Sequence, residues 1–189
     1  TTDTKPLEFL EHTCQNSIFL NPVTEEEVGD IISNLKNTDS IGYDNIPTKL
    51  LKFCSSELTQ ILTYINNESI QEGIFPDGLK IARVTPIYKS EDKKQVNNYR
   101  PISILTPLSK VSEKIMYSRL TDYITKHSIL HPSQYGFRTG HSTSMALLKI
   151  VDDLTRAVDD RQITVGIFVD LAKAFDTVDH NILMKKLEF

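Results

Sequence analysis

A stretch near the end of the chain carries residues that could do chemistry. Residues 163–169 are apolar and β-rich, which predicts a buried central strand, and Asp170 follows directly. Burying an unpaired charge costs on the order of several kcal/mol, so a carboxylate placed there needs a metal ion, an arginine or a hydrogen-bond network. Asp170 is therefore a candidate metal ligand. The strand alone favours a simpler explanation, an aspartate that caps the next turn.

Two cations farther upstream could bind a polyphosphate. Residues 81–89 and 97–105 each have an extended pattern, and the charged segment 90–94 between them predicts a β-hairpin. Lys89 lies at one base of this hairpin and Arg100 on the opposite arm. A lysine point charge facing an arginine fork suits a triphosphate, which needs donors from several directions. Without other information, two solvated surface cations would be the simpler interpretation.

A third candidate segment combines aromatic and basic side chains. Arg138 follows Tyr135 and Phe137 closely, and His141 comes three residues later. Such a combination favours stacked bases and phosphates of a nucleic acid. Aromatic residues beside a glycine turn are as often core residues, so both interpretations stay open.

Charge is distributed unevenly along the chain. The formal net charge is −4, which argues against a generic nucleic-acid binder, but residues 80–138 hold eleven Lys and Arg against four Asp and Glu. This basic block could neutralise phosphates, or it could be an ordinary solvated surface. Within it, Lys110, Lys114 and Arg119 could line a nucleic-acid groove, although a solvated helix face is the commoner outcome.

The cysteines and the hydropathy pattern exclude other classes. Cys14 and Cys54 lie far apart and form no C-x-x-C pair, which argues against a zinc site and a disulfide framework and favours an intracellular setting. No apolar run approaches the ~20 residues needed to span a bilayer. We expect a soluble protein without a membrane partner.

Helices must position most of these residues. Start signals predict helices at Thr24, Pro47, Thr106, Ser142 or Ser144, and Asp179. The first signal is a capping box, and the second and third helices have a proline at their first position. The helix that begins at Ser142 or Ser144 should pack its apolar stripe on the sheet that contains residues 163–169. Helices with scattered strands indicate an α+β fold but do not select an architecture.

The segment FVDLAKAFDTVDH, residues 168–180, resembles the first catalytic motif of reverse transcriptases of non-LTR retrotransposons. Three further stretches match the same family in the same order: GYDNIP followed by TKLLK, PIYK followed by YRPIS, and QYGFR followed by HST. The resemblance covers about residues 24–189. It implies an RNA-directed DNA polymerase that copies RNA into DNA during retrotransposition by two-metal nucleotidyl transfer.

The resemblance also implies an architecture. It is a right-hand polymerase, with a lead-in at residues 1–22, fingers at 23–130 and part of a ferredoxin-like palm at 131–189. The palm would be truncated before the second catalytic motif. Its central strand would then lack neighbours, so we expect this end of the chain to be aggregation-prone or poorly ordered.

Matching residues carry roles over from the family. Asp170 and the backbone carbonyl of Leu171 would bind Mg²⁺ (or Mn²⁺), and Lys89 and Arg100 would hold the triphosphate of the incoming nucleotide. Phe175 would lie under its sugar and reject a 2′-hydroxyl, although periodicity alone makes it a core residue.

The family also implies partners: an RNA template, a DNA primer and deoxynucleoside triphosphates, in the cytoplasm or nucleus. Arg138, Tyr135 and His141 are weaker candidates for contacts with nucleic acid. The remaining residues that match the motif are Lys173, Asp176 and His180. We expect Asp176 to organise a turn rather than bind a metal ion, and His180 to pack or hydrogen-bond at the start of a helix rather than act as a base.

One departure from the family limits what these residues can do. The family's second catalytic segment, an aromatic-x-Asp-Asp hairpin, has no counterpart in this sequence. A lone aspartate binds Mg²⁺ weakly because the ion gives up its waters reluctantly. We therefore expect this polypeptide alone not to polymerise. The alternative is a truncated, non-catalytic relic that acts at most as a nucleic-acid-binding module.

Overall fold

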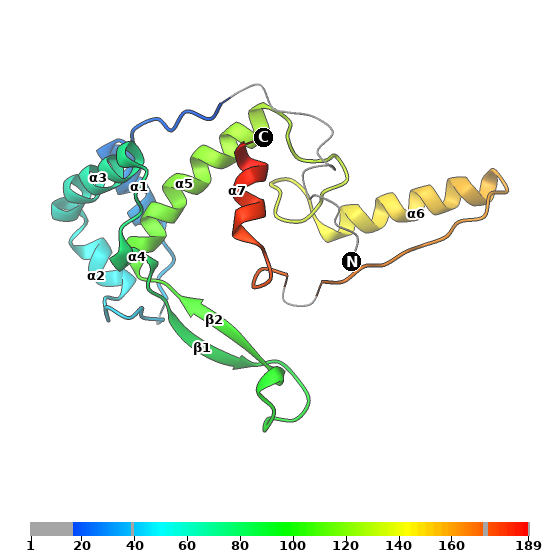
Figure 1. The fold of residues 1–189 in the computed structure, drawn as a ribbon, viewed down its shortest axis with the longest axis horizontal. Coiled ribbons are helices and arrows are strands. Elements are labelled where there is room, and N and C mark those ends of the chain that lie inside the picture. The colour runs from blue at the N-terminus through cyan, green and yellow to red at the C-terminus, as the bar shows by residue number, and fades with distance from the viewer. Residues whose placement is uncertain (1–16, 39, 172–173, 189) are drawn as a thin grey trace. The chain divides into compact units, whose positions relative to one another are not determined.

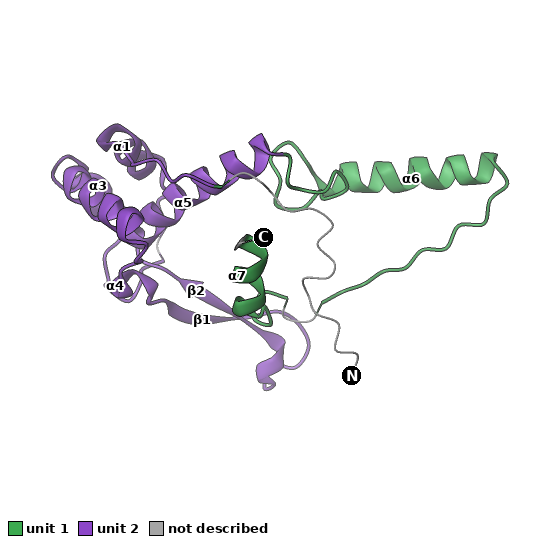
Figure 2. Cartoon of the chain, turned by 45° about the horizontal axis from the view of Figure 1, so that its top comes forward, with its two compact units in different colours: residues 1–17, 128–189 green, residues 18–127 purple. Residues whose placement is uncertain are grey.

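The computed structural model describes residues 17–38, 40–171 and 174–188, coloured along the chain in Figure 1. Cys14, Lys173 and most of the expected lead-in lie outside these residues. The chain divides into two compact units, one formed by residues 18–127 and the other by residues 1–17 and 128–189 (Figure 2). No helix among the described residues is long and apolar enough to cross a membrane.

The unit of residues 18–127 contains helices and one hairpin. Its elements are α1 (Glu25–Asn34), α2 (Thr48–Phe53), α3 (Ser55–Glu72), α4 (Asp77–Lys80), β1 (Arg83–Tyr88), the short 3₁₀ helix η2 (Val96–Asn98), β2 (Tyr99–Ile104) and α5 (Pro107–Lys126). The mixture of helices with a small antiparallel sheet confirms the α+β class.

Local signals place the helix ends. The Thr24 side chain accepts a hydrogen bond from the Glu27 amide, and Thr106 accepts one from the Ser109 amide, as expected for capping residues. Gly73 ends α3 with φ +67°, a left-handed conformation that favours glycine. Pro47 is the residue before α2 rather than its first residue, a difference of one position.

Four helices supply most of the core of this unit. Burying each of these apolar side chains contributes about 1.5–3 kcal/mol, so their packing rather than helix propensity holds the unit together. The buried apolar residues are Val23, Val28, Ile32, Leu35, Leu51, Leu62, Val111 and Ile115.

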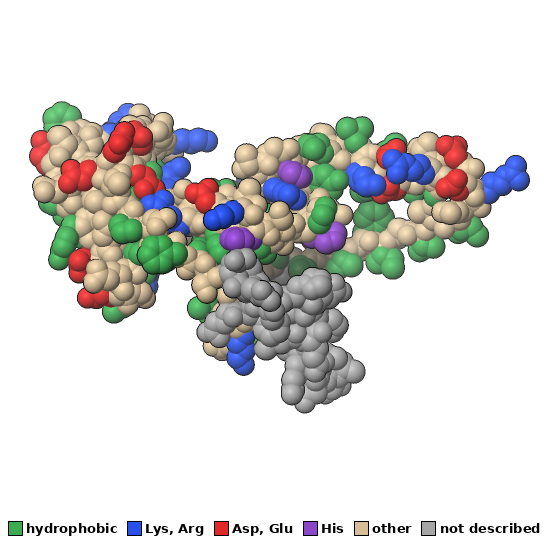
Figure 3. All heavy atoms as spheres, turned by 90° about the horizontal axis from the view of Figure 1, so that it is seen from above, with side chains coloured by type: hydrophobic (Ala, Val, Ile, Leu, Met, Phe, Trp, Pro, Cys, Tyr) green, Lys and Arg blue, Asp and Glu red, His purple; other side chains and the backbone are tan. Residues whose placement is uncertain are grey.

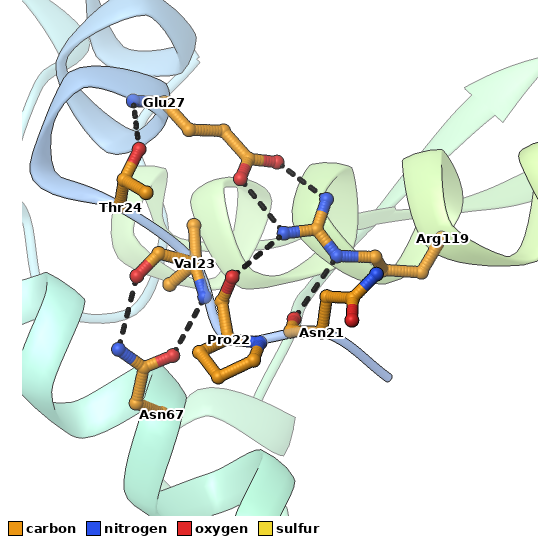
Figure 4. A network of polar contacts seen from close by, with 7 residues as sticks. All are labelled: Asn21, Pro22, Val23, Thr24, Glu27, Asn67 and Arg119. Atoms are coloured by element: carbon orange, nitrogen blue, oxygen red, sulfur yellow. Dashed lines mark hydrogen bonds and ion pairs between the residues drawn. The ribbon is translucent and has the colours of Figure 1, made fainter. Parts of the chain in front are cut away.

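An ion pair joins two helices far apart in sequence. Arg119 of α5 donates two hydrogen bonds to Glu27 of α1, each 2.7 Å long, and Glu27 hydrogen bonding raises the pKa of Arg119 (Figure 4). The same guanidinium also donates to the carbonyls of Asn21 and Pro22. Arg119 therefore neither lines a groove nor lies on a solvated face, and both sequence-based interpretations of it are wrong.

A side-chain amide holds the chain just before α1. Asn67 of α3 accepts a 2.7 Å hydrogen bond from the Val23 amide and donates a 3.0 Å bond to the Val23 carbonyl (Figure 4). Together with Arg119, Asn67 fixes the entry into α1 through hydrogen bonds to the backbone of residues 21–23.

A close approach explains the glycine in the GYDNIP segment. A Cβ on Gly42 would lie 3.0 Å from the Thr106 Cα, which is backbone and cannot rotate away. Thr106 is itself held, because Ser109 joins its hydroxyl and donates to the Leu79 carbonyl at 2.8 Å. Gly42 is therefore required by the space available and not by a left-handed backbone conformation.

The second unit holds α6 (Thr143–Asp159) and α7 (His180–Glu188). Ser142 caps α6 through its hydroxyl, and the Asp179 carboxylate accepts from the Asn181 and Ile182 amides at the start of α7. Both helices begin where the sequence predicts.

The expected strand at residues 163–169 is not formed. These residues have no regular secondary structure and their apolar side chains are exposed, Phe168 by 91%. A strand is stable only with ladder partners, and none of the described residues pairs with this segment. The expectation that the apolar stripe of α6 packs on a sheet is therefore also wrong. Apolar side chains stand at the surface in the part of the chain that holds α6 (Figure 3).

Candidate nucleotide and nucleic-acid site

The hairpin brings its two predicted cations onto one face. In the β1–β2 register Ile87 is opposite Arg100, and the Lys89 amide donates a 2.8 Å hydrogen bond to the Asn98 carbonyl one step farther along. Cross-strand partners share a face, and so do residues two apart on one strand. Lys89 is thus diagonal to Arg100 on the same face, with both side chains exposed. Register places Arg83 on this face as well.

The opposite face of the hairpin is aromatic and fixes the loop at its tip. The Tyr88 and Tyr99 rings meet edge to face with centroids 5.7 Å apart. Their hydroxyls donate to the Glu91 and Lys93 carbonyls, at 2.6 and 2.9 Å. The Lys93 ammonium lies 5.4 Å from the Tyr88 ring centroid. Loop 89–98 is therefore built by specific contacts that the charged sequence did not indicate.

Asp170 lies in the exposed irregular segment, not at the end of a buried strand as expected. The Leu171 side chain beside it is also exposed. Among the described residues, no three His, Cys, Asp or Glu side chains cluster closely enough to hold a metal ion. Asp170 and Leu171 together supply one carboxylate, so on their own they do not fit a centre of two metal ions.

Phe175 contacts an aromatic residue from another matching motif. Its ring lies edge to face with that of Phe137, with centroids 6.0 Å apart. The side chains are 79% and 92% exposed, so the alternative that either is a core residue is wrong. Phe137 has φ +57°, an uncommon conformation for a bulky residue.

The neighbouring candidates are also linked within the turn. The Tyr135 ring lies 5.8 Å from the His141 ring, and Arg138 donates to the His131 carbonyl at 3.3 Å. All three keep exposed or half-exposed side chains. Asp176 lies in the turn at residues 174–177 and His180 begins α7.

Residues 91–189, just over half the chain, match the family model described as reverse transcriptase (RNA-dependent DNA polymerase). This chain belongs to the reverse transcriptase family. The resemblance to reverse transcriptases of non-LTR retrotransposons is confirmed.

Individual members of the reverse transcriptase family match nearly the whole chain. The "Probable RNA-directed DNA polymerase from transposon BS" of Drosophila melanogaster is 33% identical over 96% of this chain and 20% of its own length. The "RNA-directed DNA polymerase from mobile element jockey" of the same species is 32% identical over 95% and 20%. The chain thus spans about a fifth of the length of these relatives.

Two features of this reverse transcriptase chain escaped sequence reasoning. One is the Arg119–Glu27 pair, since nothing local connects residues 92 positions apart. The other is a hollow between α1 and α5 lined by Lys36 together with two lysines of α5. The sequence marks Lys110 and Lys114 as possible groove residues, but that Lys36 lines the same hollow depends on tertiary packing.

Proposed function

We propose that this chain is the part of a retrotransposon's RNA-directed DNA polymerase that carries the nucleotide-binding hairpin and the first catalytic aspartate. The observation that supports this best is the hairpin register, which sets Lys89 and Arg100 on one exposed face in a chain of the reverse transcriptase family. The enzyme copies an RNA template into DNA from a primer, using deoxynucleoside triphosphates.

Each proposed residue has a physical task in nucleotide binding. The Lys89 ammonium and the Arg100 guanidinium hold the triphosphate, and the Arg100 fork fixes its orientation. Phe175 lies under the sugar, where its ring excludes a 2′-hydroxyl. The exposed ring of Phe137 supports Phe175 from the side. Arg138, Tyr135 and His141 contact the nucleic acid.

This proposal assigns the units to a right-hand polymerase. Residues 23–130 form the fingers and residues 131–189 the first part of the palm. Asp170 and the Leu171 carbonyl are this chain's contribution to the Mg²⁺ (or Mn²⁺) site on which reverse transcriptases depend. Bound ions would stabilise charge on the transferring phosphate. The other carboxylates must come from an aromatic-x-Asp-Asp segment.

Primer extension tests the proposal on the full protein encoded by the reading frame that contains these residues. With an RNA homopolymer template and a DNA primer, we expect incorporation that Asp170→Asn lowers by about a thousandfold or more. Asp160→Asn, at the exposed end of α6, is the matched control and should keep full activity. Equal activity of the two variants, or none in the unaltered protein, would contradict the proposal.

A second candidate function is a nucleic-acid-binding module without catalysis. It is favoured by one observation, that no three His, Cys, Asp or Glu side chains of the described residues cluster closely enough to hold a metal ion. The purified 189-residue chain should bind RNA but show no primer extension. Incorporation above background by this chain would exclude the second candidate.

A further inference from the structure

The hollow between α1 and α5 concentrates positive charge away from the hairpin. It has a volume of 590 Å³, and both helices and the start of α2 contribute to its lining. Lys36 comes from the segment after α1, and Lys110 and Lys114 from one face of α5. Glu113 is the one carboxylate among its described lining residues, so positive charge dominates.

The three lysines are available for a ligand. None of them forms an ion pair with a residue that the structure describes. By contrast, Lys52 nearby donates to the Ser33 carbonyl at 2.8 Å, so its ammonium is already used at the end of α1. Keeping three unpaired ammonium groups around one hollow raises their mutual repulsion, which a bound anion would relieve.

An aromatic side chain completes the lining. Tyr117 lies seven residues after Lys110, on the same face of α5, and is 62% exposed. An exposed aromatic ring beside several cations is the combination that binds single-stranded nucleic acid, because bases stack on the ring while phosphates meet the cations. A free polyphosphate would use the lysines but not the ring.

Negative charge beside the hollow limits the length of a ligand that can bind. The adjoining hollow between α1 and α5 shares Lys114 and Tyr117, but it is lined by Glu26, Glu27 and Asp30. A phosphate chain would be repelled there. The ligand must therefore place only a short stretch of backbone against the lysines.

We propose that the hollow formed by Lys36, Lys110, Lys114 and Tyr117 binds one short stretch of an RNA strand, separately from the nucleotide-binding hairpin. The proposed function supplies the identity of the strand, and the lysines and Tyr117 supply the binding chemistry. Two or three phosphates meet the lysines and one base stacks on Tyr117.

RNA binding by the full 189-residue chain tests this inference without metal ions or nucleotides. Fluorescence anisotropy with a labelled uridine 12-mer should show at least about a tenfold loss of affinity in the variant Lys36→Gln, Lys110→Gln, Lys114→Gln. The slope of log affinity against log salt should shrink by about 2, because each phosphate contact contributes about 0.7 on a single strand.

Matched variants separate the hollow from overall charge. Lys49→Gln, Lys126→Gln and Lys149→Gln together remove the same charge elsewhere and should keep affinity within about twofold. Replacing the three hollow lysines by arginine should restore RNA binding. Tyr117→Leu should weaken RNA binding without changing the salt slope. Equal losses in the two glutamine variants, or no loss in the hollow variant, would overturn the inference.

A competition arm distinguishes RNA from a free polyphosphate. Inorganic tripolyphosphate should displace the 12-mer only weakly, and Tyr117→Leu should not affect its binding. Tripolyphosphate that binds the hollow as tightly as the RNA would overturn the RNA assignment. Because this assay needs no catalysis, loss of the inference leaves the Asp170 primer-extension result unaffected, and the reverse also holds.

Discussion

At the scale of single residues, the Arg119 guanidinium has the largest set of polar contacts in the described part of the unit of residues 18–127. It makes a two-pronged ion pair with Glu27 and also bonds two carbonyls before α1 (Figure 4). The two side chains are only 14% and 28% exposed, so solvent screens this pair less than a surface ion pair.

Arg119→Gln should lower the free energy of unfolding by about 1–3 kcal/mol, since it removes charged hydrogen bonds and leaves two carbonyls unpaired. Urea denaturation followed by circular dichroism measures this. The raised pKa of Arg119 means that its contribution is present below its ordinary pKa and fades only as pH rises above that value. The loss should therefore be equal at about pH 7 and about pH 9. Arg156→Gln in α6, an exposed pair, is the control with little effect.

Replacing glycine by alanine should have opposite effects on stability at two positions. Gly42→Ala should destabilise the chain by about 1–3 kcal/mol, because the new methyl meets the Thr106 backbone. Gly29→Ala, inside α1 with nothing within 4 Å of the new atom, should stabilise it by about 0.5–1 kcal/mol. Thermal denaturation of both variants measures these changes in stability. A stabilised Gly42→Ala protein would show that Thr106 does not hold Gly42 in place.

At the scale of elements, the sequence predicts those helix ends and turns that depend on residues close together in the chain. The caps at Thr24, Thr106 and Ser142 depend on contacts three residues apart, and the hairpin pairs two strands that follow one another in the chain; the structure confirms both. The strand at 163–169 could not be settled in this way. A continuous apolar run indicates that a strand would be buried, but forming its ladder depends on partner strands elsewhere in the chain.

Exposed segment 163–169 should therefore be cleaved early by proteases. Limited chymotrypsin digestion should cut after Phe168 well before Tyr64, which is 65% exposed but held in α3. Mass spectrometry of the early fragments measures the order. Cleavage at Tyr64 first, or a segment as resistant as α3, would mean that residues 163–169 are paired in solution.

At the scale of the whole molecule, the two units differ in how much apolar surface each one buries. All buried apolar side chains among the described residues belong to the unit of residues 18–127. The second unit carries Asp170 and Phe175 on exposed chain, and several apolar side chains of its helix α6 are exposed as well. The nucleotide site that we propose takes residues from both units, so the packing inside either unit could not predict it.

Cross-linking of a nucleotide tests that site most directly. Radiolabelled deoxythymidine triphosphate is irradiated with the full protein of this reading frame, an adenine homopolymer RNA template and a DNA primer, and the labelled peptides are mapped. We expect label in two peptides, one from the hairpin with Lys89 and Arg100 and one spanning Asp170 to Phe175, both dependent on template and primer. Label confined to one unit, or unchanged without template and primer, would contradict a shared nucleotide site.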